Sequence, residues 1–283
     1  MSEPIVVGTD GSGESDRAVE WAAAEAVLRR RPLRIVHAVE SWPFKVPLFA
    51  PPEKAERLAR VGNALLEEAA ARVRERWPDL ETSTALLAEE TPDALRQQSE
   101  DAFELVLGSR GRGGFASLLL GSTSLWVASR STVPVVIVRG DVTDRGEVVA
   151  GVDLRRGTDA VLDYAFDAAA VRGARLRIVH AWQMPTTLID AGYTAEEEEG
   201  AGRELRERMA AACDPHRRGH PQVEVADEVV LKHPVTALTG PSRDARLIVA
   251  GAHERRWNAP RLGSTGHGVI HHAQCPVAMV PPR

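Results

Sequence analysis

The hexapeptide LRIVHA stands at residues 33–38 and again at residues 176–181, a shift of 143 positions. The same shift aligns VVGTD at 6–10 with VAGVD at 149–153, and Gly108 with Gly251. Further on the shift falls to 142, because LGST at 120–123 aligns with LGST at 262–265. A self-similar period of this length predicts one domain written twice. We expect the domains to span residues 1–141 and 146–283.

Each copy alternates short apolar runs with helical patterns. The first copy predicts helices at about 14–30, 53–76, 91–101 and 121–131 between strands at 4–8, 33–39, 81–87, 103–108 and 133–139. The second copy predicts strands near 147–151, 175–181, 223–231, 246–251 and 276–280. Strands that alternate with helices pair in parallel through right-handed crossovers. The sequence therefore predicts an α/β fold with two tandem doubly wound parallel sheets of five strands each.

The composition excludes several classes of protein. A net charge of −5 and a pI of about 6.0 give no electrostatic footprint for nucleic acid or an anionic membrane. No run approaches the ~20 apolar residues of a spanning helix, and the start shows no signal peptide. Only two cysteines occur, of which Cys213 is expected to be exposed and Cys275 buried. We expect a soluble, cytoplasmic protein.

Two predicted strand ends carry unusual chemistry, and ligands of open parallel sheets bind beyond such ends. Gly8, Thr9 and Asp10 follow the first strand, and the glycine-rich stretch 108–124 follows the fourth. Glycines let successive backbone amides approach one phosphate, and a helix start adds further amides. The candidate donors of this stretch are Gly108, Ser109, Arg110, Gly111, Arg112, Gly113, Gly114, Gly121, Ser122 and Thr123. The layout predicts a triphosphate site.

Asp10 suits another part of such a ligand, because a carboxylate repels phosphates but accepts hydrogen bonds well. It would accept from ribose hydroxyls or the adenine amino group, or hold Mg²⁺ together with the phosphates. The adenine would lie against the end of the second strand, near Ala38 and Val39. The sequence contains no Walker A loop. The turn after the first strand is not a Rossmann fingerprint, because Asp16 stands where a third glycine would be needed after Gly11 and Gly13.

No residue pattern predicts catalysis or a structural metal. No convincing general base or nucleophile stands beside the phosphate stretch, so at most weak ATP hydrolysis is expected. His37 and His180 occupy the same place in the repeat and are expected to be hydrogen-bonded at a strand end. His271 and His272 are adjacent and face different directions, which disfavours metal binding.

The spacing G-x2-G-x9-G-[ST] at Gly108, Gly111, Gly121 and Ser122 resembles the ATP-binding signature of the universal stress protein family. VVGTDGS and HAQCPVAMVPP resemble the family's first-strand and fifth-strand motifs. The resemblance covers nearly the whole chain, twice. It implies the strand order 3-2-1-4-5, a Rossmann-like fold of the adenine nucleotide alpha hydrolase type, and either a homodimer or another form of self-association. It also implies ATP binding and a regulatory role in stress, dormancy or growth. Carried over by position, the nucleotide contacts are Gly8, Asp10, Ala38, Gly108, Gly111, Gly121, Ser122 and Thr123.

The second copy departs from this pattern. Its matching residues are Gly151, Asp153, Ala181, Gly251, Gly263, Ser264 and Thr265. However, Glu254 stands where Gly111 stands, and Arg155 replaces Ser12. A glutamate in a phosphate cradle is unfavourable, although Arg255, Arg256 and Arg261 would offset its charge. We expect the second site to bind ATP more weakly.

Two other functions stay open at this point. One is a slow ATPase or an enzyme of adenylyl chemistry with the same fold. The other is an interaction scaffold without a nucleotide, and the intact first phosphate stretch argues against it. The regulatory protein partners are unknown.

Overall fold

A computed structural model describes residues 2–39, 52–111, 120–184, 194–252 and 262–282. The chain divides into two compact units, Met1–Arg139 and Gly140–Arg283. The domain limits expected from the sequence, 1–141 and 146–283, stay a prediction about where each domain can be cut. No helix among the described residues has an apolar stretch long enough to cross a lipid bilayer.

The first unit alternates strands and helices along the chain. Its elements are β1 (Ile5–Gly8), α1 (Gly13–Arg29), β2 (Leu33–Ala38), α2 (Pro52–Arg76), β3 (Thr82–Leu87), α3 (Thr91–Ser99), β4 (Glu104–Gly108), α4 (Ser122–Ala128) and β5 (Val135–Val138). The strands pair in parallel in the order β3-β2-β1-β4-β5. This confirms the predicted α/β class and the order 3-2-1-4-5.

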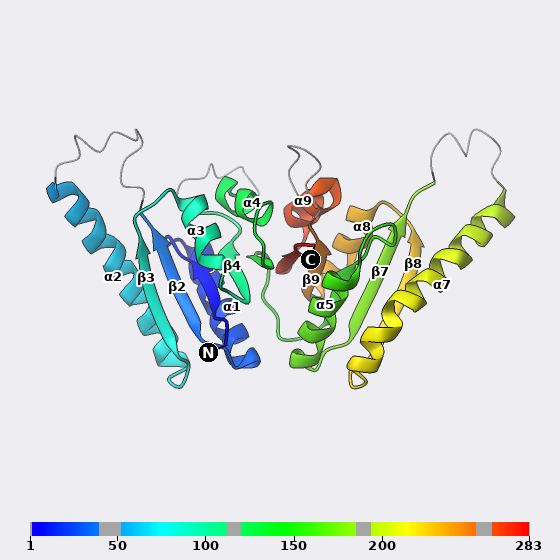
Figure 1. Cartoon of the computed structure of the whole chain (residues 1–283), viewed down its shortest axis with the longest axis horizontal. Coiled ribbons are helices and arrows are strands. Elements are labelled where there is room, and N and C mark those ends of the chain that lie inside the picture. Colours follow the sequence, from blue (N-terminus) through cyan, green and yellow to red (C-terminus); the bar gives the residue numbers. More distant parts are fainter. Residues whose placement is uncertain (1, 40–51, 112–119, 185–193, 253–261, 283) are drawn as a thin grey trace. The chain divides into compact units, whose positions relative to one another are not determined.

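The second unit repeats this plan. Its elements are β6 (Glu147–Gly151), α5 (Asp159–Arg172), β7 (Leu176–Trp182), α7 (Ala195–Gly219), β8 (Val225–Leu231), α8 (Pro234–Thr239), the 3-10 helix η2 (Gly240–Arg243), β9 (Ala245–Gly251), α9 (Gly263–His272) and β10 (Val277–Val280). The order β10-β9-β6-β7-β8 is the same as in the first unit, read from the other end. Figure 1 labels the main elements of both units.

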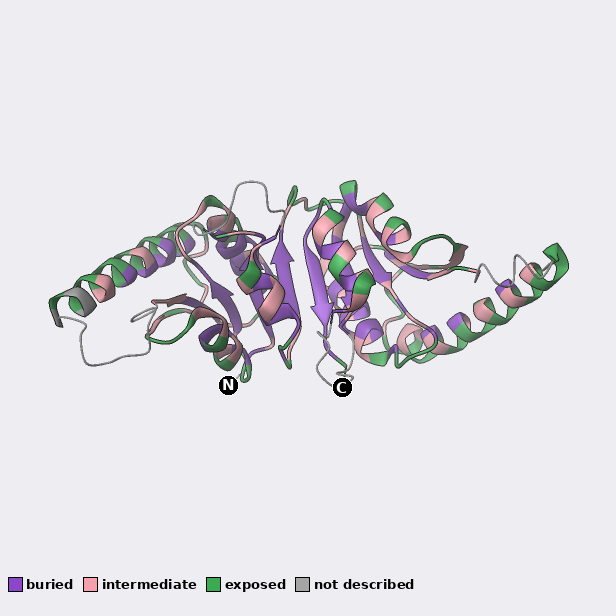
Figure 2. Ribbon diagram, turned by 90° about the horizontal axis from the view of Figure 1, so that it is seen from above, coloured by how far each residue is buried: buried purple, intermediate pink, exposed green. Residues whose placement is uncertain are grey.

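Each sheet is covered by helices on both faces, as right-handed crossovers in two directions require. In the first unit α1 packs with α2, and α3 packs with α4. In Figure 1, α2 runs along β3 and α7 runs along β8. The central strands are buried on both sides, and β1, β4, β5 and β10 contain only buried residues. Figure 2 shows buried strands in both units and exposed outer sides on the two long helices, α2 and α7. The apolar runs of the sequence are therefore the cores of the two sheets.

One sequence expectation about the thiols is wrong. Cys213 lies on the inner side of α7 with no exposed surface, and Cys275 is equally buried. Burial raises the pKa of the Cys213 thiol to about 11, because the apolar surroundings disfavour the thiolate. A reactive surface thiol is thus not a feature of the described part of this chain.

A buried ion pair anchors α1. Glu25 and Arg29 lie 2.5 Å apart, one turn from each other, and both side chains are at most 3% exposed. The Arg29 guanidinium also lies 4.6 Å from the ring centroid of Phe103, the residue that precedes β4. Removal of one partner from such a pair leaves an uncompensated buried charge.

We therefore predict that Glu25→Ala lowers the free energy of unfolding by about 3 kcal/mol. Glu20→Ala, at an exposed position of the same helix, is the matched control and should change it by less than about 0.5 kcal/mol. Urea titration of the full chain measures both. Equal losses in the two variants would show that the buried pair does not stabilise the unit.

Candidate nucleotide site

The first unit contains a hollow of about 560 Å³ beyond the carboxyl ends of β1, β2 and β4. In the order β2-β1-β4 the chain reverses direction across the sheet between β1 and β4, and ligands of doubly wound folds bind at this switch point. The volume lies within the range of about 300–1,000 Å³ that small-molecule sites occupy. The hollow is therefore the candidate site of this unit.

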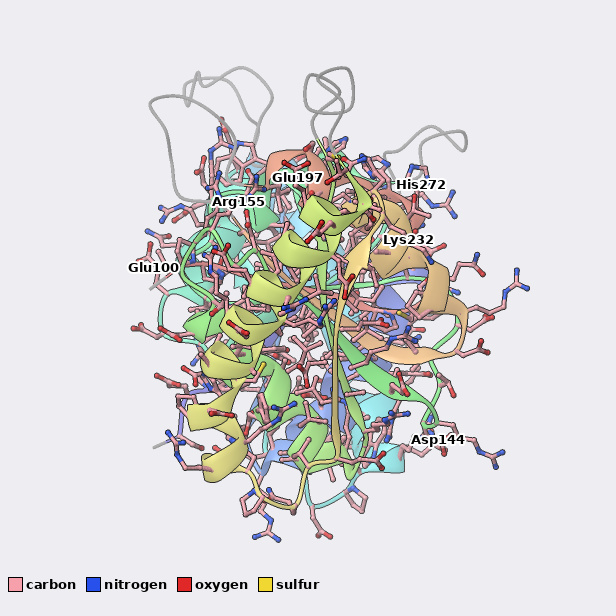
Figure 3. All side chains as sticks on the ribbon, turned by 90° about the vertical axis from the view of Figure 1, so that its right-hand side faces the viewer. Glu100, Asp144, Arg155, Glu197, Lys232 and His272 are labelled. Atoms are coloured by element: carbon pink, nitrogen blue, oxygen red, sulfur yellow. The ribbon has the colours of Figure 1, made fainter. Side chains whose placement is uncertain are left out.

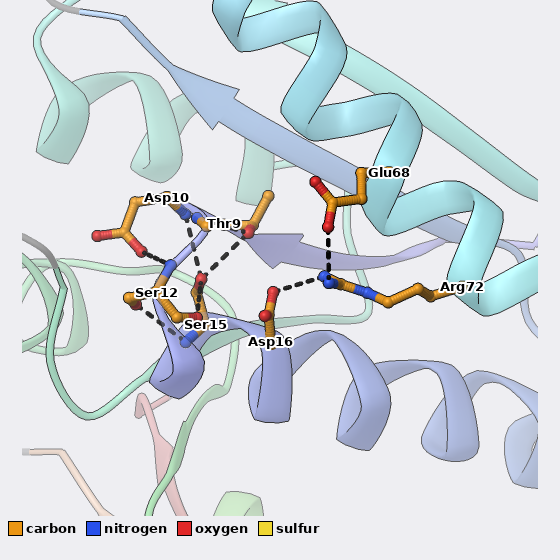
Figure 4. A network of polar contacts seen from close by, with 8 residues as sticks. Thr9, Asp10, Ser12, Ser15, Asp16, Glu68 and Arg72 are labelled. Carbon is orange, nitrogen blue, oxygen red and sulfur yellow. Dashed lines mark hydrogen bonds and ion pairs between the residues drawn. The ribbon is translucent and has the colours of Figure 1, made fainter.

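A network of hydroxyl groups fixes the turn between β1 and α1, as Figure 4 shows. The Ser15 hydroxyl donates to the Ser12 carbonyl at 2.9 Å and accepts from the Asp10 amide at 3.3 Å. Because its one proton is already donated, the Thr9 hydroxyl must donate to the Ser15 oxygen, which lies 3.1 Å away. The Ser12 hydroxyl caps α1 by accepting from the Ser15 amide at 3.2 Å. Both the Thr9 and the Ser15 protons are thus used inside the protein.

Asp10 is held by the same turn. Its Oδ1 accepts a hydrogen bond from the Ser12 amide at 3.0 Å. Its Oδ2 faces Gly111, where a Cβ atom would lie only 2.5 Å from that oxygen. Any side chain at position 111 would therefore push the carboxylate away. The first-strand turn and the stretch after β4 meet at this point.

His37 forms part of the wall at the end of β2. Its Nδ1 lies 2.7 Å from the Thr9 carbonyl, which can only accept, so Nδ1 carries the hydrogen. His180 makes the equivalent bond to the Val152 carbonyl at 2.9 Å in the second unit. The expectation of a hydrogen-bonded strand-end histidine is confirmed in both copies.

Gly108 and Gly121, the first and last glycines of the signature, have different roles. A Cβ at Gly108 would lie 2.9 Å from the backbone carbonyl of Glu14, so this glycine lets β4 pack against the start of α1. Among the described residues, the nearest atoms to a Cβ at Gly121 would lie 3.6 Å away. The Gly121 amide, which we expected to be a free donor, instead donates to the Ser109 carbonyl at 2.8 Å. This bond closes the loop between β4 and α4.

The donors that remain are the next three amides. The first intrahelical bond of α4 runs from the Leu125 amide to the Gly121 carbonyl at 3.2 Å. The amides of Ser122, Thr123 and Ser124 therefore precede the hydrogen-bonded turn, and all three residues line the hollow. The Ser124 hydroxyl donates a hydrogen bond to the Gly108 carbonyl at 2.8 Å. The hollow thus meets a cluster of backbone N–H groups on this side.

Charge at the rim comes from Arg110 and Glu14, which lie 3.1 Å apart. Partial burial works against ionisation of Glu14, but hydrogen bonds from Arg17 and Arg110 outweigh it and hold the pKa of Glu14 below its usual value. Arg110 lines the hollow and is shared between this glutamate and any anion that enters.

Most of the described candidate residues of the first copy lie together. Those that line the hollow are Gly8, Thr9, Asp10, Ala38, Gly108, Arg110, Gly111, Gly121, Ser122 and Thr123. Val39 is not among the residues around the hollow: its amide pairs with the Leu87 carbonyl of β3 at 2.8 Å. Ser109 is buried and does not line the hollow. Its amide donates to the Val138 carbonyl of β5 at 3.0 Å, which holds the end of β4 against β5. Arg112, Gly113 and Gly114 lie outside the described residues.

Other lining residues were not predicted. Thr91 and Leu95 of α3 close one side, and Leu120 closes another. The remainder are Ser15, Val36, His37, Leu107 and Ser124. For Ser15 and Ser124 the spacing from the signature glycines was the available signal. The packing of α3 beside the hollow could not be predicted from the local sequence pattern.

The second unit has an equivalent hollow of about 700 Å³. Gly151, Asp153, Ala181, Gly251, Ser264 and Thr265 line it, as their positions in the repeat predict. Gly263 is not among its lining residues; it opens α9 with a left-handed φ of 58°. Glu254, Arg255, Arg256 and Arg261 lie outside the described residues.

The signature glycines give a stability prediction. Gly108→Ala should lower the free energy of unfolding by about 1–3 kcal/mol, because the new methyl group presses on the backbone of Glu14. Gly121→Ala has room for its methyl group and should change it by less than about 1 kcal/mol. Urea titration of both variants tests the difference; equal losses would contradict the separate roles.

Comparison with known proteins identifies the family. The model of the universal stress protein family matches residues 1–139 and again 145–281. A universal stress protein from Mycolicibacterium smegmatis is 33% identical over 289 residues, which cover 99% of this chain and 97% of that protein. The crystal structure of a universal stress protein from Archaeoglobus fulgidus superposes with a TM-score of 0.74 at 21% identity and covers 99% of both chains.

A second structure from Archaeoglobus fulgidus, a universal stress protein in complex with dAMP, is 26% identical. It covers 48% of this chain and 98% of that one, with a TM-score of 0.37. That relative therefore binds an adenine nucleotide. The two matched copies and the full-length relative show that this chain belongs to the universal stress protein family, in its tandem two-domain form.

Proposed function

We propose that the first domain binds ATP in the hollow beyond β1, β2 and β4. The observation that carries this proposal is the cluster of three amides at Ser122, Thr123 and Ser124, which borders the same hollow as Asp10 and Ala38. A ligand that is anionic at one end and rich in hydroxyl and amino donors at the other matches these two sides.

The phosphates would lie on the α4 side. Backbone N–H groups that precede the first helical turn are ready donors to phosphate oxygens. The Ser122 and Thr123 hydroxyls add donors, and Arg110 adds positive charge.

The nucleoside would lie toward β1 and β2. The Asp10 carboxylate would accept from ribose hydroxyls or the adenine amino group. It would alternatively hold Mg²⁺ together with the phosphates, since carboxylate oxygens suit this ion. Ala38, at the end of β2, would lie against the base.

We propose that the nucleotide acts as a regulatory ligand in stress response, dormancy or growth control by changing conformation or assembly. The Thr9 and Ser15 hydroxyls line the first hollow and donate to a hydroxyl and to a backbone carbonyl, neither of which is a base that could activate them as nucleophiles. This favours binding over rapid turnover. Self-association as a homodimer, regulatory protein partners and a cytoplasmic location stay predictions.

For the second domain we propose weaker ATP binding. Asp153, the counterpart of Asp10, is engaged by Arg155 at 3.1 Å and Arg156 at 3.4 Å. The oxygens of Asp153 are therefore engaged by neighbouring arginines and less available to the donors of a nucleoside.

We predict that Ser122→Glu lowers the affinity of the full chain for ATP by about 30-fold or more, because the new carboxylate lies where the phosphates would bind. The exposed first residue of a helix tolerates glutamate, so the fold should keep its stability. Isothermal titration with ATP measures the affinity.

Two matched variants complete this experiment. Ser122→Gln adds the same bulk without charge and should stay within about fivefold of the parent affinity. Ser264→Glu places the same change at the equivalent exposed position of the second domain and should leave the tighter site unchanged. Unaltered ATP binding in Ser122→Glu would refute the proposed phosphate position.

A further inference from the structure

The hollow of the second domain differs from the first where the chain leaves its first strand. The first turn, residues 10–17, contains three acids and one arginine, whereas the aligned residues 153–160 contain two acids and two arginines. The two added cations are Arg155 and Arg156, which stand where Ser12 and Gly13 stand in the first copy. Both arginines line the second hollow.

These arginines bind Asp153, the counterpart in the second domain of Asp10. Arg155 contacts Asp153 Oδ1 through both its backbone amide and its Nε at 3.1 Å, and the Arg156 Nε lies 3.4 Å from Oδ2. Burial opposes ionisation of Asp153, but the hydrogen bonds from Arg155 outweigh it and keep the pKa of Asp153 below its usual value. The carboxylate stays charged and is neutralised by its own neighbours.

The arginines are themselves accessible. The side chains of Arg155 and Arg156 are 81% and 56% exposed, so each has donors left to offer a ligand. Figure 3 shows Arg155 at the same end of the unit as Lys232, which follows β8. This is the end at which the strands of the second sheet finish and the hollow lies.

The second hollow is also more open on this side. Gly157 stands where Glu14 stands in the first copy, and a Cβ at Gly157 would meet no atom of the described residues within 4 Å. In the first domain the Glu14 carboxylate occupies this side and pairs with Arg110. The second hollow accordingly extends over residues 155–161, whereas only Ser15 of the matching stretch lines the first. Asp159 also lines this extension, but its carboxylate is 80% exposed and lies 3.8 Å from His216.

We propose that the second hollow is a site for phosphate-bearing ligands of any base, held through Arg155 and Arg156. This site would select ligands by their charge, because Asp153, the carboxylate that would contact a nucleoside, is already paired with Arg155 and Arg156. The inference extends the proposed function: the first domain would recognise ATP by its nucleoside and phosphates, and the second would accept a di- or triphosphate group whatever it is attached to.

The test uses the full chain with Ser122→Glu, which leaves the second hollow as the phosphate site under study, and inorganic pyrophosphate as the probe. Replacement of Arg155 and Arg156 by the residues of the first copy, Arg155→Ser with Arg156→Gly, should weaken pyrophosphate binding by about tenfold or more. Arg145→Ser with Arg203→Ser removes the same charge at two exposed positions and should stay within about twofold. Isothermal titration at low ionic strength gives all three affinities.

Three further ligands test the selectivity in the same background. ATP and GTP should bind the second hollow with affinities within about threefold, and adenosine should show no binding. Pyrophosphate binding that survives the loss of both arginines, or adenosine that binds as tightly as ATP, would overturn the proposal. Wild-type chain titrated with pyrophosphate keeps the test independent of the first site: arginine-dependent binding there supports the proposal even if ATP fails to bind the first domain.

Discussion

The candidate site depends on one backbone hydrogen bond, from the Gly121 amide to the Ser109 carbonyl. Ser109 is fixed in turn by its own amide, which pairs with β5, so the end of β4 cannot move relative to the sheet. The bond ties the start of α4 to this rigid edge, and the amides of Ser122 to Ser124 then border the hollow. Because the start of α4 is fixed in this way, its three amides are positioned before a ligand binds, which lowers the cost of ordering them.

On the opposite side of the hollow, the turn between β1 and α1 is held by hydrogen bonds among its own groups. The Thr9 and Ser15 hydroxyls both donate and accept within the turn, and the Ser12 hydroxyl accepts there. Together with the Ser12 amide, which donates to Asp10 Oδ1, these bonds set the position of Asp10. In the second domain the same framework carries different charges, since two arginines replace Ser12 and Gly13 and a glycine replaces Glu14. Duplication has thus kept the sheet and the position of the hollow while the groups that would meet a ligand have changed.

Much of this arrangement could be predicted from the sequence, because a repeated period and alternating apolar runs determine the class of sheet and its strand ends. The limits are equally physical. Gly108 looked like a phosphate-binding glycine, yet the backbone of Glu14, far away in sequence, is what requires it. The burial of Cys213 and the approach of Thr91 and Leu95 depend on how helices pack on the sheet, which local patterns do not contain. The Gly121 amide was expected to be free, but it pairs with the Ser109 carbonyl. Because every residue has a carbonyl, the sequence gives no sign of which one an amide will pair with.

A crystal structure of the full chain with ATP tests the central claim most directly. The account predicts phosphate oxygens within hydrogen-bonding distance of the Ser122, Thr123 and Ser124 amides, with the nucleoside toward Asp10 and Ala38. ATP found elsewhere on the first domain, or a first hollow that stays empty at saturating ATP, would contradict it.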